Sequence, residues 1–177
     1  MRQQKKLKPL QHGFTLVEFG IVALIIAFLT AIVGGSFIIR NQQATGLEVG
    51  KSVAEAMRKM KSRGSDTFPA NATAAFISTN AFDQQPLFRV NAGRTTVDHL
   101  IADPAAITAA AASGVLTVTI AGVPSYACEN LVAAMDSAST TITVGSTVVK
   151  TATSTKVDLN QVSCAFGTTT TVVATIR

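Results

Sequence analysis

The sequence contains few aromatic and few charged residues. Tryptophan is absent, tyrosine occurs once, and charged residues make up 14% of the 177 residues. Alanine, threonine and valine are abundant instead. Because β-branched side chains pack well on a pleated surface, this composition favours strands over a large aromatic core.

The residues from which most active sites are built are also scarce. The chain has 2 histidines and 2 cysteines, and their positions show no metal-ligand spacing. His99 lies beside Asp98 and near Asp103, yet no nucleophile elbow or oxyanion-type glycine motif accompanies it. P-loop and dinucleotide motifs are absent as well. We therefore interpret His99 as a surface loop histidine and predict a structural protein, not an enzyme, without metal or cofactor.

The positive net charge is concentrated at the N-terminus. Arg2, Lys5, Lys6 and Lys8 supply +4 of the formal charge of +5, so residues 14–177 carry only +1. Nucleic-acid binding therefore gains no support from the net charge. Basic residues beside a membrane span stay in the cytoplasm, which predicts a cytoplasmic leader, residues 1–13, and an exported C-terminal domain.

One long apolar run dominates what the sequence does contain. Residues 14–39 are long enough as a helix, about 39 Å, to cross a bilayer. A secretory signal is the alternative, but its apolar part would be shorter and would end in a small-x-small site. We therefore predict a transmembrane helix over residues 14–39.

An acid interrupts this run near its start. Glu18 would cost roughly 2.5 to 3.5 kcal/mol or more in a membrane, which makes it a candidate functional residue. A cut between Gly13 and Phe14 would create an α-ammonium one helical turn from Glu18. In a low-dielectric setting these charges attract by something on the order of several kcal/mol. The alternative is a carboxylate at the end of the span that reaches the headgroups.

The basic leader, Gly13, the run Phe14-Thr15-Leu16-Val17-Glu18 and the apolar helix occur in the order of a known signal. They resemble the class III signal of type IV pilins and type II secretion pseudopilins. The resemblance implies that a prepilin peptidase cleaves after Gly13 and that Phe14 is then N-methylated. It also implies that Glu18 pairs with the amino group of a neighbouring subunit during filament assembly.

The same resemblance implies a location and partners. The prepilin would wait in the inner membrane of a Gram-negative cell and would then enter an extracellular pilus, or fimbrium. That homo-oligomeric helical filament would be held together by residues 14–39. An inner-membrane assembly platform with its ATPase and an outer-membrane secretin would be the other partners.

Residues 40–63 are predicted to continue the helix in amphipathic form. Val49, Val53, Met57 and Met60 recur at spacings of three and four and predict one buried stripe. The segment has six basic and two acidic residues, net +4, whereas residues 66–177 have five and seven, net −2. Either its charges form a solvated face, or they meet the acidic domain of another subunit.

The remaining residues, 64–177, are predicted to form one α+β domain with an antiparallel sheet on which the long helix packs. Residues 66–112 are interpreted as loops, with a helix over residues 105–112 capped by Asp103 and started by Pro104. Alternation predicts a strand over residues 115–120, closed by Gly122 before a turn at residues 123–125. A helix over residues 128–138, a hairpin of residues 141–144 and 147–150, and a strand over residues 169–176 complete the prediction.

Cys128 and Cys164 lie in the exported part, where a disulfide can persist. The bond would stabilise the domain by roughly 3 to 4 kcal/mol, and two free thiols are the alternative. A Val-Pro-Ser-Tyr-Ala-Cys segment over residues 123–128, a short helix and a second cysteine resemble the type IVb pilins, particularly the major pilins of thin conjugative pili, the PilS type. In such pilins the stretch between the cysteines, here residues 129–163, is exposed on the filament.

The sequence thus predicts the structural subunit of a type IV pilus that serves conjugation or cell adhesion. A minor pilin or a type II secretion pseudopilin shares every N-terminal feature and stays open. A membrane-anchored binding protein or enzyme that keeps its leader and never polymerises is the alternative from another class.

Overall fold

The computed structural model describes residues 16–63, 68–83, 86–164 and 167–177; within the first range, the side chains of residues 16 and 31–42 are not described. The chain divides into two compact units after Ile38. Helix α1 (Leu16–Arg63) belongs to both units, since its first part lies in the N-terminal unit and its remainder in the C-terminal unit. Lys61 and Arg63 in its last turn are placed favourably for the negative end of the helix dipole.

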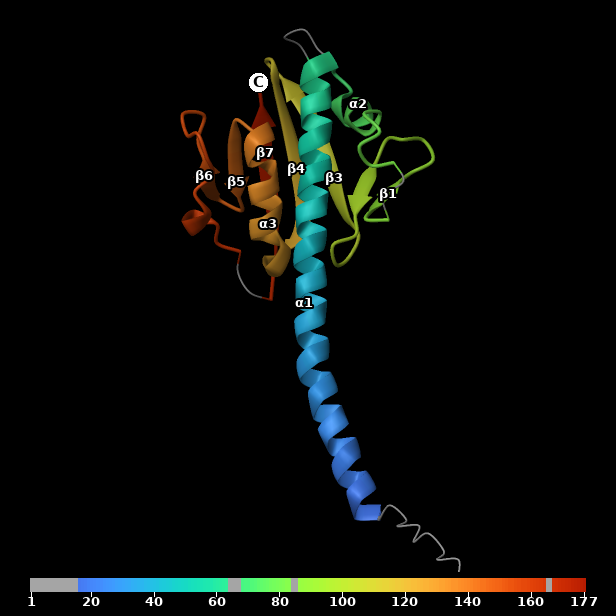
Figure 1. Ribbon diagram of the computed structural model, residues 1–177. Coiled ribbons are helices and arrows are strands. Elements are labelled where there is room, and N and C mark those ends of the chain that lie inside the picture. The colour runs from blue at the N-terminus through green and yellow to red at the C-terminus, as the bar shows by residue number, and fades with distance from the viewer. Residues whose placement is uncertain (1–15, 64–67, 84–85, 165–166) are drawn as a thin grey trace, which may run out of the picture. The chain divides into compact units, whose positions relative to one another are not determined.

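The C-terminal unit is built on a seven-stranded sheet in the order β1-β2-β3-β4-β7-β5-β6. Every pairing in it is antiparallel. The last strand of the chain, β7, lies between β4 and β5 (Figure 1). The strands are β1 (Phe88–Val90), β2 (Val97–His99), β3 (Ala105–Ala112), β4 (Val115–Pro124), β5 (Thr141–Val144), β6 (Thr147–Lys150) and β7 (Thr169–Ile176).

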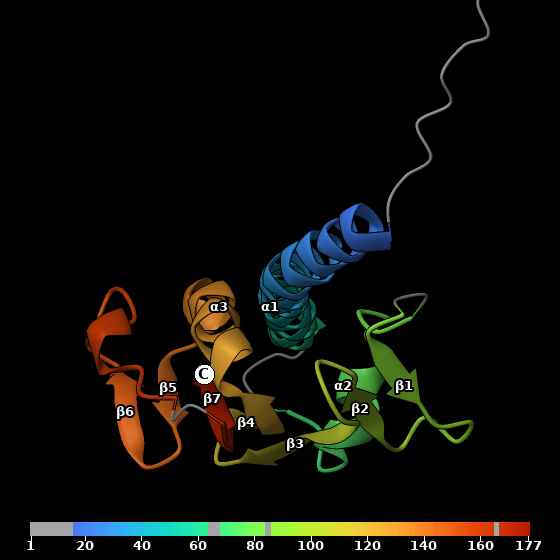
Figure 2. The ribbon, with the colours of Figure 1, turned by 90° about the horizontal axis from the view of Figure 1, so that it is seen from below.

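Helices α2 (Ala72–Ile77) and α3 (Ser125–Met135) complete the domain, with 3₁₀ turns η1 (Asp136–Ala138) and η2 (Leu159–Gln161). The second half of α1 and α3 lie beside each other on one face of the sheet (Figures 1 and 2). Helix α2 lies at β3, where the hydroxyl of Thr73 donates to the carbonyl of Ala109 at 2.7 Å and accepts its N–H at 3.1 Å. These two bonds give partners to the backbone N–H and C=O of Ala109. That residue lies beyond Ile107, where the pairing of β3 with β2 stops.

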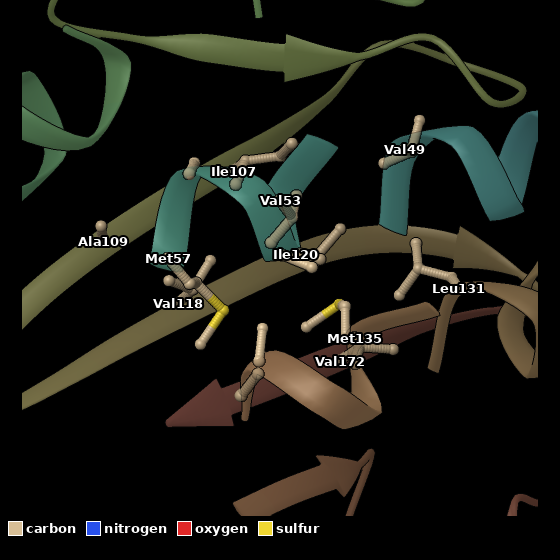
Figure 3. Close-up of a cluster of buried hydrophobic side chains, with 14 of the residues drawn as sticks. Val49, Val53, Met57, Ile107, Ala109, Val118, Ile120, Leu131, Met135 and Val172 are labelled. Atoms are coloured by element: carbon tan, nitrogen blue, oxygen red, sulfur yellow. The ribbon is translucent and has the colours of Figure 1, made fainter. Parts of the chain in front are cut away.

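The core lies between the helices and the sheet. The predicted stripe of Val49, Val53, Met57 and Met60 is buried, which confirms the amphipathic half of α1. In Figure 3, Val53 and Met57 of α1 point toward side chains of β3 and β4. The same layer of the core contains Ile107, Val118, Ile120, Leu131, Met135 and Val172.

The predicted α+β class with an antiparallel sheet is confirmed. The hairpin of β5 and β6, the strand β7 and the helix α3, which η1 extends to Ala138, lie where the sequence predicts them. The end of α1 at Arg63 also agrees with the prediction.

The helix predicted over residues 105–112 is wrong. These residues form β3, which pairs with β4 from Ile107↔Ile120 to Ala112↔Val115. Ile107 and Ala109 face the core while Thr108 and Ala110 are exposed, so burial alternates with a period of two. Six of the eight residues are alanine. This composition hides the alternation and carries the highest helix propensity, which the pairing with β4 overrides.

The turn predicted at residues 123–125 is also wrong, because β4 continues to Pro124. Its register against β7 shifts between Ile120 and Val123. Gly122 has a φ of +65°, and a Cβ there would lie 2.6 Å from the Cβ of Ala105. The glycine therefore forms a bulge inside the strand instead of ending it.

Candidate functional site

The most conspicuous surface of the chain is the apolar segment, which we define as residues 17–30 of α1. All 14 of these residues are exposed. Thr30 does not depend on water there, since its hydroxyl donates to the carbonyl of Ile26 at 2.7 Å. A helix that is apolar all round is normally covered by protein or lipid. The exposed fractions of its large apolar side chains are 69% for Val17, 70% for Phe19, 56% for Ile21, 44% for Val22, 71% for Leu24, 50% for Ile25, 57% for Ile26, 64% for Phe28 and 53% for Leu29.

Glu18 is the acid of this segment and lies in the first turn of α1. A carboxylate there is favoured by the positive end of the helix dipole. The predicted cleavage site, Gly13 and Phe14, lies outside the described residues. The predicted pairing of Glu18 with a cleaved N-terminus therefore stays a prediction.

Within the part of the chain that the structure describes, no helix is both long and apolar enough to cross a membrane. The predicted span over residues 14–39 includes residues outside that part.

The second half of α1 carries a close helix contact that the sequence prediction missed. A Cβ at Gly46 would lie 2.6 Å from the carbonyl oxygen of Ala127, and one at Gly50 would lie 2.7 Å from that of Leu131. The two glycines are four residues apart, so they occupy one face of α1 and admit the backbone of α3. That spacing in the sequence is the signal that could have revealed the contact.

The basic residues of the 40–63 segment contact their own domain. Arg58 donates to the hydroxyl of Ser137 at 2.6 Å. Lys59 forms an ion pair with Glu55 at 2.7 Å and also donates to the carbonyl of Thr79. Arg63 donates to the carbonyl of Ser78, the C-cap residue of α2. These contacts hold α2 and η1 against α1, so part of the predicted charge face serves the fold itself.

The predicted disulfide is present and joins Cys128 of α3 to Cys164. The segment between these cysteines is only partly exposed. Leu131, Val132 and Met135 of α3 are buried, and Ile142 and Val149 lie in the core. Residues 151–156 and 158–161 are exposed, so the prediction of an exposed 129–163 stretch holds only for its later part.

A buried ion pair ties this later part to the domain. Lys150 is 6% exposed, and its Nζ lies 2.7 Å from Oδ1 of Asp136. The same Oδ1 accepts the backbone N–H of Val157 at 3.0 Å. The N–H of Asp158 also donates to the carbonyl of Val149 at 2.8 Å. These bonds fold residues 151–158 back onto β6, where Val148 and Leu159 present exposed apolar side chains.

The interpretation of His99 as a surface loop residue is wrong. His99 ends β2 and is fully buried. Its Nε2 lies 2.7 Å from the carbonyl oxygen of Ala121, and its Nδ1 accepts the N–H of Ile101 at 3.5 Å. Burial lowers the pKa of His99 from its ordinary value of 6.5, while the bond to Ala121 and the charge of Asp98 oppose this shift. Burial therefore favours the neutral ring, and the tautomer with its proton on Nε2 fits both contacts.

The chain is similar to one protein family and to two solved structures. Residues 99–177 match the family model "PilS N terminal". A search of curated proteins finds no match. The type IVb pilin from Salmonella typhi is similar in structure, with a TM-score of 0.51 and 18% identity over 74% of this chain and 97% of that one. TcpA, a type IV pilin from Vibrio cholerae El Tor biotype, has a TM-score of 0.49 and 15% identity over 76% of this chain and 99% of that one.

Proposed function

We propose that this chain, whose fold is that of the type IV pilins and whose residues 99–177 match the PilS family, is the structural subunit of a type IVb pilus. The observation that carries the proposal is the exposed apolar segment, residues 17–30, on a chain with a pilin fold. Such a surface needs a cover, and identical helices from neighbouring copies supply one that repeats without limit. An interface of this head-to-tail kind generates an open helical filament.

The route into the filament begins in the membrane. We propose that the inner membrane covers residues 14–39 until a prepilin peptidase removes residues 1–13. Phe14 is then N-methylated, and the assembly platform with its ATPase transfers the subunit into a pilus that leaves the cell through a secretin. The support for these steps is the class III signal in the sequence.

In this proposal, Glu18 determines how far neighbouring subunits are shifted along the filament axis. Its carboxylate lies in the first turn of α1, among side chains that neighbouring helices would cover. A buried carboxylate is costly unless a positive group compensates it, and the α-ammonium of another subunit provides that charge. A helix displaced by one turn would separate the two charges.

The test compares two isosteric changes in the same helix, Glu18→Gln and Glu48→Gln. Glu48 is exposed in the second half of α1 and serves as the matched control. Both variants should be trimmed to Phe14, as shown by mass spectrometry of the N-terminus. Filaments sheared from cells should drop about tenfold or more for Glu18→Gln, since a charge-assisted bond contributes about 1.5 to 3 kcal/mol.

Wild-type filament yield from Glu18→Gln would refute the assembly role. A chain that keeps Met1 and stays outside filaments would refute the pilin function and support a membrane-anchored binding protein. The abundance of the subunit in the sheared material separates a major from a minor pilin or pseudopilin.

We further propose that the pilus acts in conjugation or adhesion and that the chain has a structural, not an enzymatic, role. The support is the likeness to the PilS family over residues 99–177.

A further inference from the structure

We propose that His99 is a pH-sensitive latch that holds the β1–β2 edge of the domain to the bulge in β4 and releases this edge in acid. The edge comprises residues 86–101, which contain two strands of three residues each. Three register pairs, from Val97↔Ile107 to His99↔Ala105, join it to the rest of the sheet.

The latch lies at the bulge in β4. The register of β3 with β4 ends at Ile107↔Ile120, and that of β7 with β4 shifts between Ile120 and Val123. Ala121 therefore has no register partner in β3 or in β7. The Nε2–H of His99 donates to this carbonyl at 2.7 Å and thus links β2 to β4 past the start of β3.

Protonation of the His99 ring would remove the acceptor that faces the N–H of Ile101. The Nδ1 of His99 faces the N–H of Ile101 at 3.5 Å, so a proton on Nδ1 would place two donors against each other. The ring is 0% exposed, so its positive charge would also lose hydration. Burial already lowers the pKa of His99 for this reason.

The charged groups around the ring do not compensate a buried cation. Asp98 is the neighbour whose charge favours the protonated form, but it lies opposite Arg89 of β1 in the register. Phe88 and Ala105, which pair with His99 from β1 and β3, are apolar. Helix α2 contains no ionisable residue. Asp103 in the β2–β3 loop, and Glu48 and Lys51 of α1, are exposed.

The direction of the pH effect follows from the lowered pKa. Above 6.5 the ring is neutral in both the closed and the open edge, so the latch is at full strength. As the pH falls through 6.5, His99 binds a proton more readily in the open edge than in the closed edge. Protonation therefore shifts the equilibrium toward the open edge. Opening would expose Phe88, Val97 and Ile101, which are buried in the closed edge.

Amide hydrogen exchange of the full-length chain in detergent tests the latch. The open population of residues 88–101 should rise up to roughly 25-fold between about pH 7 and about pH 5, after correction for intrinsic exchange rates. Residues 169–176, in the central strand β7, should not follow. His99→Gln keeps a donor for Ala121 and an acceptor for Ile101 but cannot titrate, so it should abolish the rise. His12→Gln, which changes the only other histidine, should retain it.

A rise of the same size in His99→Gln, no rise in the wild type, or an equal rise in β7 would overturn the proposal. If His99→Gln does not fold, an NMR titration of the wild-type His99 ring decides. A midpoint clearly below the ordinary 6.5 supports the latch, and a midpoint at or above this value overturns it.

Discussion

At the scale of single residues, Gly46 and Gly50 fix the distance between α1 and α3. No side chain larger than hydrogen fits at Gly50, because the carbonyl of Leu131 and the Cβ of Ala134 occupy the position of its Cβ. The close approach brings Val49 and Val53, which flank the glycines in the helix, into the core. The glycines therefore position the half of α1 that joins the domain.

We predict that Gly50→Ala lowers the free energy of unfolding of the domain by about 1 to 3 kcal/mol through overpacking. Gly20→Ala is the matched control, because a Cβ at Gly20 has no atom within 4 Å. It should leave the domain unchanged while improving the helix propensity. Urea unfolding of both variants in detergent, followed by circular dichroism, measures the difference. Equal stability of the two variants would show that α3 moves to accommodate the methyl group.

Glu18 could be recognised as a candidate functional residue from the sequence, whereas the burial of His99 could not. Glu18 stands out in the sequence because the residues around it are apolar. His99 has two acids near it in the sequence, Asp98 and Asp103, which suggested an exposed position, whereas its burial depends on strands far along the chain. Its partner, the carbonyl of Ala121, lies at a register shift that arises only when β4 pairs with β7.

At the scale of elements, periodicity predicted those with a clear apolar face. The second half of helix α1 buries the stripe that the sequence assigns to its inner face, and helix α3 and the strands β4 and β7 form at or near the predicted residues. Strand β3 was not predicted, because its alanines give no contrast in polarity between the two faces of the strand. Strands β1 and β2 are three residues long, which is too short for a pattern to appear.

The disulfide holds a segment that lies outside the sheet. It anchors Cys164, near the start of β7, to α3, while the Lys150–Asp136 pair anchors residues 151–158. We predict that the double change Cys128→Ala and Cys164→Ala lowers the free energy of unfolding by about 4 kcal/mol, because the bond closes a loop of about 36 residues.

Thermal unfolding with and without a thiol reductant measures this effect. The reductant should destabilise the wild type and leave the double variant unchanged. A reductant effect of equal size on both proteins would show that it does not act through this bond.

At the scale of the whole molecule, the order of the strands differs from their order in the chain. The C-terminal strand β7 lies in the interior of the sheet, between β4 and β5, so the domain is completed only when its last residues pair. Such long-range pairing cannot be read from local patterns. The sequence could nevertheless indicate the class of the protein, because the signal at its N-terminus is local.

The apolar segment distinguishes this chain from an ordinary soluble protein of its size. Its nine large side chains, each at least 44% exposed, lie in one continuous run of α1. Among the described residues, the domain leaves only two large apolar side chains exposed, Val148 and Leu159, so this segment is the larger apolar surface that requires a cover. The account therefore depends on what touches residues 17–30 in the assembled state.

Photo-cross-linking inside sheared filaments tests this most directly. A benzophenone amino acid in place of Leu24, which is 71% exposed, should give a ladder of subunit multimers after illumination. The same amino acid at Thr153, in the exposed loop of the domain, provides the reference for contacts outside the helical core. The account predicts that the Leu24 ladder consists of this subunit alone. Monomers only, or adducts with other proteins only, would contradict it.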